Sequence, residues 1–146
     1  MTRLTGHCLC GAVTLDIAPA KEALTACNCE NCRRWTGGVN FTFEVEAETA
    51  RIDGPVRTYS PESWDERAFC GICGSGISYR FTGAGPLNGL LKVSAGLFDD
   101  AGGRRLGAEF FVDERPAAFD LGQPHPEMTA AEVAAVLGTG LPEDRP

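Results

Sequence analysis

The chain is poor in the side chains on which many enzymes depend. Among its 146 residues are only two histidines, two tyrosines and two methionines. It has no serine–histidine–acid set, no phosphate-binding loop and no G-x-G-x-x-G fingerprint after a predicted strand. These absences argue against a serine hydrolase and against nucleotide chemistry.

Positive charge and long apolar runs are also scarce. The 13 lysines and arginines face 20 aspartates and glutamates, which gives a formal net charge of -7. Such an acidic surface repels nucleic acid and anionic lipid. No stretch approaches the roughly 20 apolar residues that span a bilayer. We therefore expect neither a nucleic-acid partner nor a membrane segment.

Cysteine, in contrast, is abundant and tightly clustered. The seven cysteines form a C-x-C pair, a C-x-C-x-x-C triplet and a C-x-x-C pair: Cys8 and Cys10; Cys27, Cys29 and Cys32; Cys70 and Cys73. A disulfide framework usually has an even count and a secreted context. The residues before the first cysteine contain no apolar run typical of a secretion signal. Random placement of buried, inert cysteines would seldom give three clusters. We therefore predict metal binding in a reducing cytoplasm.

The ligand type and count suggest two zinc ions per chain. All-thiolate sets suit zinc or an iron–sulfur cluster, and the spacings match neither common ferredoxin pattern. Structural zinc takes four protein ligands, whereas catalytic zinc takes three and keeps one position open. Seven ligands divide into four plus three. The sequence favours one closed and one open site, although other pairings of the three clusters stay possible at this point.

Local patterns indicate how each cluster is presented. Cys8 and Cys10 lead into an alternating segment, so we expect both thiols on one face of a strand. The segment 70–74 resembles a zinc knuckle, in which glycines let the backbone fold around the sulfurs. His7 alternates away from the first pair, and His125 lies between two prolines, so we expect neither to be a ligand. The triplet then lacks a fourth ligand and is open to water or a substrate thiol.

The rest of the chain predicts a mainly β protein of one domain, residues 1–146. Segments with period-two alternation or continuous apolar character are separated by glycine- and proline-rich turns. The predicted strands include 13–17, 41–45, 77–81, 90–95 and 109–112. A short helical turn is expected over 30–35. Thr129 and Glu132 form a capping box before a C-terminal helix over about 129–138.

The cysteine motifs, in this order, resemble the glutathione-dependent formaldehyde-activating family, which includes the centromere protein V domain. The similarity covers about residues 3–121, and it is carried by the segments 6–13, 27–37, 69–75, 93–100 and 111–114. The resemblance implies an Mss4-like β-tent with zinc-bearing loops. It also implies a structural zinc held by one set of cysteines and a catalytic zinc held by the other. The structural set is Cys8, Cys10, Cys70 and Cys73, and the catalytic set is Cys27, Cys29 and Cys32.

The activity implied by this resemblance is that of a carbon–sulfur lyase on a thiol–aldehyde adduct. The family reaction joins formaldehyde and glutathione to give S-(hydroxymethyl)glutathione, so a small-molecule thiol and an aldehyde are the expected partners. Arg33 and Arg34 follow the triplet and could bind the carboxylates of a glutathione-like ligand, while Gly37 would let the ligand approach the backbone. Solvated or ion-paired arginines and an ordinary turn glycine are the alternatives.

Two further functions are compatible with the same residues. A non-catalytic zinc module could bind glutathione or a protein, with both zinc ions structural. A zinc–thiolate redox sensor could release zinc on oxidation. The sequence leaves the oligomeric state, the physiological thiol and the aldehyde open.

Overall fold

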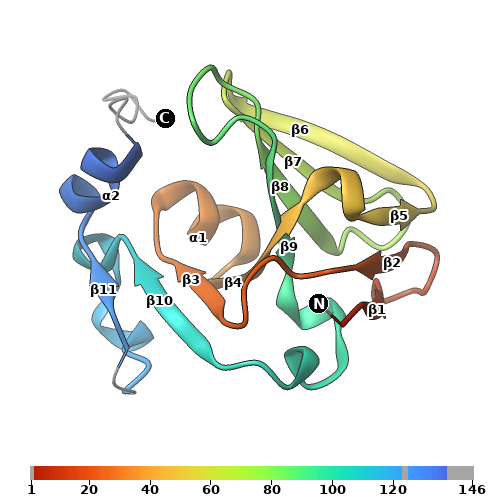
Figure 1. The fold of residues 1–146 in the computed structure, drawn as a ribbon, viewed down its shortest axis with the longest axis horizontal. Helices are drawn as coiled ribbons and strands as arrows, with labels where there is room; N and C mark the ends of the chain where they lie inside the picture. The colour runs from red at the N-terminus through yellow and green to blue at the C-terminus, as the bar shows by residue number, and fades with distance from the viewer. Residues whose placement is uncertain (1, 123–124, 138–146) are drawn as a thin grey trace.

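The computed structural model describes residues 2–122 and 125–137 and confirms a mainly β protein. A small antiparallel sheet has the order β1-β2-β5. Its strands are β1 (Leu4–His7), β2 (Thr14–Ile17) and β5 (Arg51–Asp53). In Figure 1 this sheet lies on the right, whereas β10, β11 and α2 lie on the left.

The larger sheet has eight strands in the order β11-β10-β3-β4-β9-β8-β7-β6. Its strands are β3 (Leu24–Cys27), β4 (Asn40–Glu46), β6 (Val56–Glu62), β7 (Asp65–Cys70), β8 (Gly76–Phe81), β9 (Leu90–Ser94), β10 (Leu106–Phe110) and β11 (Glu127–Met128). The pairs from β3 through β4, β9, β8 and β7 to β6 are antiparallel, while β10 runs parallel to β3 and β11.

Two α-helices accompany the strands. The helix α1 (Glu30–Thr36) connects β3 to β4, as the expected helical turn over 30–35 predicts. The helix α2 (Ala130–Leu137) begins with the predicted capping box, in which the Thr129 hydroxyl accepts a hydrogen bond from the Glu132 amide at 3.2 Å. The predicted C-terminal helix is thus confirmed over 130–137, and residue 138 lies outside the described residues. Short 3-10 turns occupy Ala47–Thr49, Ala95–Leu97, Asp99–Gly103, Val112–Glu114 and Ala117–Phe119.

The buried apolar residues form two separate clusters. The larger lies between the two sheets and contains Phe43, Ile17 and Ile77 together with Cys8 and Cys70. The smaller contains all three triplet cysteines with Tyr79 and Phe111, and Val133 of α2 packs against it. The triplet is therefore built into a core, whereas the four-cysteine group has Cys8 and Cys70 buried, Cys73 half-buried and Cys10 exposed.

Two local expectations are corrected by the structure. Cys8 and Cys10 lie in the turn between β1 and β2, not on a strand; a hydrogen bond of 3.0 Å from the Gly11 amide to the Cys8 carbonyl closes this turn. The strand expected over 109–112 instead ends at Phe110, because Phe111 adopts a left-handed conformation with φ of 57°. This conformation breaks the extended backbone and lets Phe111 join the triplet cluster.

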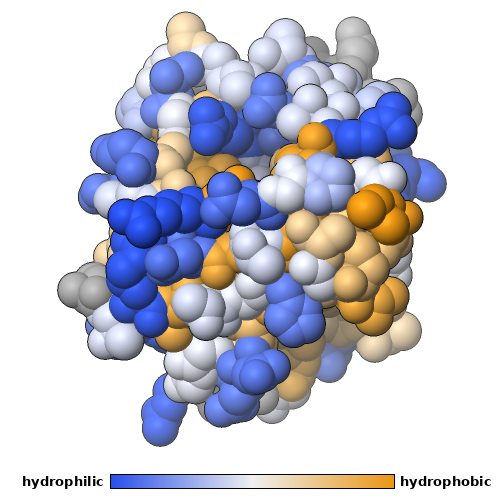
Figure 2. All heavy atoms as spheres, turned by 90° about the vertical axis from the view of Figure 1, so that its right-hand side faces the viewer, coloured by the Kyte–Doolittle hydropathy of each residue, from blue (hydrophilic) through white to orange (hydrophobic). Residues whose placement is uncertain are grey.

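No helix in the described ranges is long and apolar enough to cross a membrane. Figure 2 shows the face on the side of β5 and β6, where hydrophilic and apolar side chains are interspersed.

We predict that Gly54→Ala lowers the free energy of unfolding by roughly 3 kcal/mol, by adding steric overlap to backbone strain. Gly54 has a φ of 123°, and a Cβ there would collide with the Ala12 carbonyl and lie 2.9 Å from the Val13 Cα. Gly85 is a matched control, since its φ is 128° but a Cβ added there would meet no atom within 4 Å. Gly85→Ala should cost only about 1 kcal/mol in urea unfolding. Equal losses for the two variants would contradict this packing argument.

Candidate zinc centres and active site

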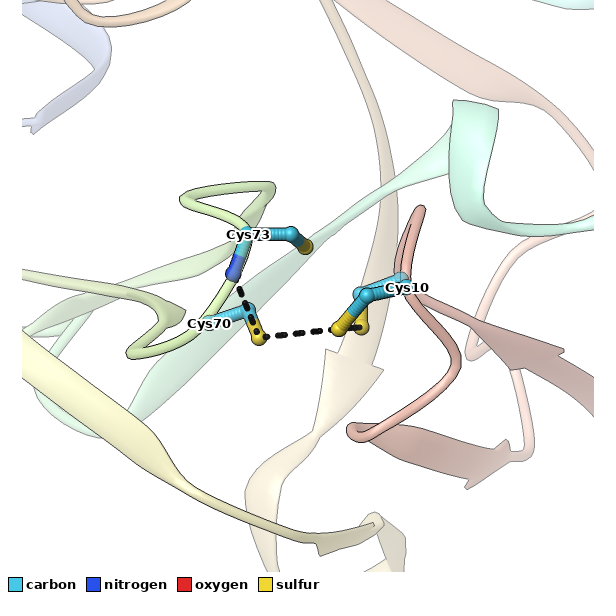
Figure 3. Close-up of side chains that lie close together, drawn as sticks. Cys10, Cys70 and Cys73 are labelled. Carbon is cyan, nitrogen blue, oxygen red and sulfur yellow. Dashed lines mark hydrogen bonds between the residues drawn. The ribbon is translucent and has the colours of Figure 1, made fainter.

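The four cysteines of the two pairs meet where the β1–β2 turn approaches the β7–β8 turn. Cys8 and Cys10 come from the β1–β2 turn, while Cys70 ends β7 and Cys73 follows in the turn before β8. The ligand atoms of all four lie within 4.8 Å of one another. Figure 3 shows Cys10 facing Cys70 and Cys73, with 3.8 Å between the sulfurs of Cys10 and Cys70. The structure thus brings together the four cysteines assigned to a structural zinc.

Backbone donors around this group suit sulfur in its thiolate form. The Cys70 sulfur accepts hydrogen bonds from the amides of Ile72 at 3.4 Å and Cys73 at 3.5 Å. A hydrogen bond with the Ser75 hydroxyl lowers the pKa of Cys73 to about 5. Zinc binds cysteine as thiolate, and four thiolates make a closed tetrahedral site. The donor set therefore fits a structural zinc ion.

The triplet is assembled by the junction between β3 and α1. Cys27 ends β3, Cys29 is the N-cap of α1, and Cys32 lies in the first turn of that helix. The Cys29 sulfur accepts a hydrogen bond of 3.4 Å from the Cys32 amide, so the capping interaction itself aims two sulfurs at one point. The ligand atoms of the three cysteines lie within 4.8 Å of one another. Three thiolates leave one position of a tetrahedral zinc without a protein ligand from this group.

Cys32 has polar partners of its own within the triplet. Both terminal nitrogens of Arg67 lie 3.7 Å from its sulfur, and the Asn40 side-chain amide donates to it at 3.6 Å. Hydrogen bonds from Cys27 and Cys29, together with the Arg67 charge, lower the pKa of Cys32 well below its ordinary value. The same shared hydrogen bonds raise the pKa of Cys27. The Arg67 guanidinium therefore favours the thiolate form of Cys32, the cysteine that it faces.

The guanidinium that faces Cys32 belongs to a buried ion pair. Arg67 is 2 % exposed and Asp65 1 % exposed, and the pair meets at 2.9 Å. Arg67 also lies over the ring of Tyr79, 4.8 Å from its centroid. No motif in the sequence points to this pair. Its only sequence signal is two opposite charges spaced i, i+2 between two cysteine motifs, a spacing that puts both on one face of a strand.

A polar row crosses the sheet next to the triplet. Arg67 on β7 pairs with Tyr79 on β8, Tyr79 pairs with Lys92 on β9, and Lys92 pairs with Glu44 on β4. The Lys92 ammonium, 7 % exposed, lies 3.3 Å from the Glu44 carboxylate. Burial lowers the pKa of Lys92 and raises the pKa of Tyr79. The row therefore contains a protonated phenol between two cationic groups.

A cavity of about 430 Å³ opens over this row and over the triplet. All three triplet cysteines border it, as do all four residues of the polar row. The other walls are mainly apolar and include Trp64, Phe81, Leu87, Phe110, Val133 and Val136. The triplet therefore faces a space that could hold a small molecule, in contrast to the four-cysteine group, none of whose cysteines lines this cavity.

A second polar network supports the triplet from behind. Asn28, fully buried between Cys27 and Cys29, donates to Glu109 at 2.8 Å. Arg115 donates to Glu109 at 2.9 Å, and the His125 side chain, 3 % exposed, lies against its other oxygen. Burial raises and these hydrogen bonds lower the pKa of Glu109, and the net shift is downward. His125 is thus packed inside the protein, although the sequence places it in a surface loop.

The carboxylates of Glu109 and Glu127 with His125 also have metal-binding spacing. Arg115 donates to both carboxylates, however, at 2.9 and 3.2 Å. Its charge neutralises one of the two carboxylates and its donors are bound to both, so we describe these residues as an ion-pair network that holds the triplet loop.

The residues proposed from the sequence to contact a thiol ligand lie outside the cavity lining. The Arg33 guanidinium donates to the Asn28 carbonyl at 3.0 Å, and Arg34 pairs with Glu30 at 3.0 Å along α1. Gly37 ends the helix in a left-handed conformation, with its amide bonded to the Arg33 carbonyl. All three thus have roles within α1, and ligand binding by them stays a prediction.

We predict that Arg67→Met lowers the free energy of unfolding by about 3–5 kcal/mol, because it leaves the buried Asp65 carboxylate without its partner. The double variant Arg67→Met/Asp65→Leu should recover much of the loss. Arg80→Met, at an exposed position on neighbouring β8, is the control and should change stability by less than about 0.5 kcal/mol. Urea unfolding at equal zinc content measures all three, and similar values for the two single variants would refute the role of the pair.

Three relationships to known proteins agree with this geometry. A family model described as "Glutathione-dependent formaldehyde-activating enzyme" matches residues 3–114. An uncharacterized lyase of Schizosaccharomyces pombe is 27 % identical over 135 residues, which cover 91 % of this chain and 96 % of the relative. The crystal structure of a Rhodobacter sphaeroides protein superposes with a TM-score of 0.57 at 18 % identity, covering 86 % of this chain and 100 % of that chain. This last likeness concerns the fold alone. Because the family model spans most of the sequence and both cysteine groups lie within its range, the chain belongs to the glutathione-dependent formaldehyde-activating enzyme family.

Proposed function

We propose that this protein is a zinc-dependent carbon–sulfur lyase that forms and breaks adducts between a small-molecule thiol, such as glutathione, and an aldehyde. The proposal rests on the different surroundings of the two cysteine groups. The four-cysteine group is a complete ligand set at the β1–β2 and β7–β8 turns and lines no part of the cavity over the triplet, whereas the three-cysteine group is incomplete and borders it. A purely structural zinc module that binds a protein on its surface has no need of such a cavity, and the open ligand set beside it favours catalysis over simple glutathione binding.

Each proposed zinc site has its own residues. Cys8, Cys10, Cys70 and Cys73 would hold the structural ion, and Cys27, Cys29 and Cys32 the catalytic one. When bound by three thiolates, zinc supplies an open coordination position for a substrate thiol and lowers the pKa of that thiol.

Arg67 has an electrostatic task in this proposal. Three thiolates and a divalent cation carry a net negative charge, which disfavours a further thiolate nearby. The buried guanidinium 3.7 Å from the Cys32 sulfur offsets this charge locally, while Asp65, which fixes the orientation of the guanidinium, leaves the whole group with one net negative charge. Because the surroundings are buried, this compensation is screened less than it would be in water.

Tyr79 is suited to assist the oxygen of the aldehyde. In the forming direction, the sulfur electron pair makes the new carbon–sulfur bond, the carbonyl π pair moves to oxygen, and that oxygen takes a proton equivalent to the one the thiol has lost. The raised pKa keeps the Tyr79 phenol protonated at neutral pH, so it can donate a hydrogen bond to this oxygen. In the reverse direction the carbon–sulfur bond breaks and the carbonyl re-forms.

We predict that the two-zinc protein accelerates the interconversion of free and hydroxymethylated glutathione. Cys32→Ser should retain about one zinc per chain, because it removes one ligand of the open site. Its acceleration of the exchange should be at least about tenfold smaller than that of the wild type. Exchange NMR on formaldehyde plus glutathione measures the rate, and metal analysis measures the zinc. Arg80→Met is the control and should match the wild type in both. No acceleration by the fully metallated wild type would overturn the proposed function.

A further inference from the structure

The cavity over the triplet is more apolar than the adduct of glutathione, a polar tripeptide, with a one-carbon aldehyde requires. Formaldehyde adds a single carbon to a thiol, and no apolar side chain gains much contact with it. The walls formed by the β8 end, the 86–90 segment, Phe110 and α2 are instead rich in large apolar groups. Ligand cavities lined in this way bury apolar parts of their ligands.

The positive charges of the cavity are largely taken up by acidic residues of the protein itself. Arg67 is bound to Asp65, while Lys92 and Lys21 both pair with Glu44 at 3.3 and 3.1 Å. Of these cations only Lys21 is well exposed, with 64 % of its side-chain surface accessible. Lys21, at the rim of the cavity, can therefore bind a carboxylate of the thiol. Arg67 and Lys92, in the walls, are already paired and offer no free charge to a second polar group.

We propose that the physiological adduct has a bulky apolar group on the carbon that is bonded to sulfur, as in the hemithioacetal of an aliphatic or aromatic aldehyde with about six to eight carbons. This inference rests on the proposed lyase function and names its substrate class. Because the family is described as glutathione-dependent, glutathione is the thiol of the adduct, and the apolar group belongs to the aldehyde. In the cleaving direction the carbon–sulfur bond breaks, the hydroxyl proton is lost as the carbonyl forms, and sulfur keeps the bonding pair.

The position of the walls determines where this group would lie. The triplet cysteines fix the place of the sulfur, and the polar row provides the Tyr79 phenol near the adjoining oxygen. The carbon chain would then extend along the walls that include Phe81, Leu87 and Val133. Trp64 also lines the cavity and stacks on Phe81 with centroids 5.9 Å apart, so its fluorescence should report on occupancy.

Binding of unreactive S-alkylglutathiones tests the inference without any need for catalysis. We expect the affinity to rise about two- to fourfold for each added methylene between S-methyl- and S-hexylglutathione, at least about 30-fold in all, because each buried methylene contributes to binding. Titration calorimetry measures the affinity and tryptophan fluorescence provides a second signal. Equal affinity along the series would overturn the apolar substrate class.

A variant of the cavity wall gives a matched comparison on one helix. Val133 lines the cavity, whereas Ala131 is exposed on the same helix and is not among its lining residues. Val133→Trp should weaken S-hexylglutathione at least about tenfold by filling the space, and Ala131→Trp should change it by less than about twofold. If both variants bind like the wild type, the alkyl group does not occupy this cavity.

Two further measurements separate this inference from the proposed function. Exchange NMR should show greater acceleration for hexanal than for formaldehyde, each with glutathione. A flat alkyl series with normal formaldehyde exchange would overturn the substrate class alone, whereas a steep series without exchange of either aldehyde would overturn the lyase function. A length dependence seen only with free alkanethiols would move the apolar group to the thiol and contradict the aldehyde assignment.

Discussion

The gathering of three cysteine sulfurs in one buried place is the constraint on which the site depends. The junction of β3 with α1 and the Cys29 cap place the sulfurs together, and any negative charge on them needs compensation because buried charge is costly. The Arg67 guanidinium supplies it from another strand, and Asp65 keeps that guanidinium from becoming an unpaired buried charge in turn. The three cysteines of the triplet, the Arg67–Asp65 ion pair and the strand register that brings them together therefore depend on one another.

The two cysteine groups differ in their surroundings, and the proposed function assigns stability to one and chemistry to the other. The four-cysteine group joins the β1–β2 turn to the β7–β8 turn, so it ties the small sheet to the large one. The triplet lies in the smaller apolar cluster, at the edge of a cavity closed partly by α2. Zinc binding at the first group would stabilise the scaffold, while the second group stays accessible to a ligand.

Much of this arrangement can be predicted from the sequence, because cysteine spacing limits which sulfurs can meet. The mainly β class, α1 and the capping box of α2 follow from local patterns, whereas the membership of the two cysteine groups is implied by the family resemblance. The Mss4-like description and the single domain stay predictions. The register of the strands does not follow from local patterns, and register aligns Arg67, Tyr79, Lys92 and Glu44 in one row. Each looks like an ordinary strand residue in the sequence, and only their pairing across four strands makes them part of the site.

The most direct test of the account is X-ray absorption at the zinc edge of the two-zinc protein. The account predicts an average of about 3.5 sulfurs per zinc, from one four-sulfur and one three-sulfur site, with a light atom completing the second. Addition of glutathione should raise the average to about four as the thiol takes the open position. An average of about four before any thiol is added, or no change afterwards, would contradict an open three-cysteine centre.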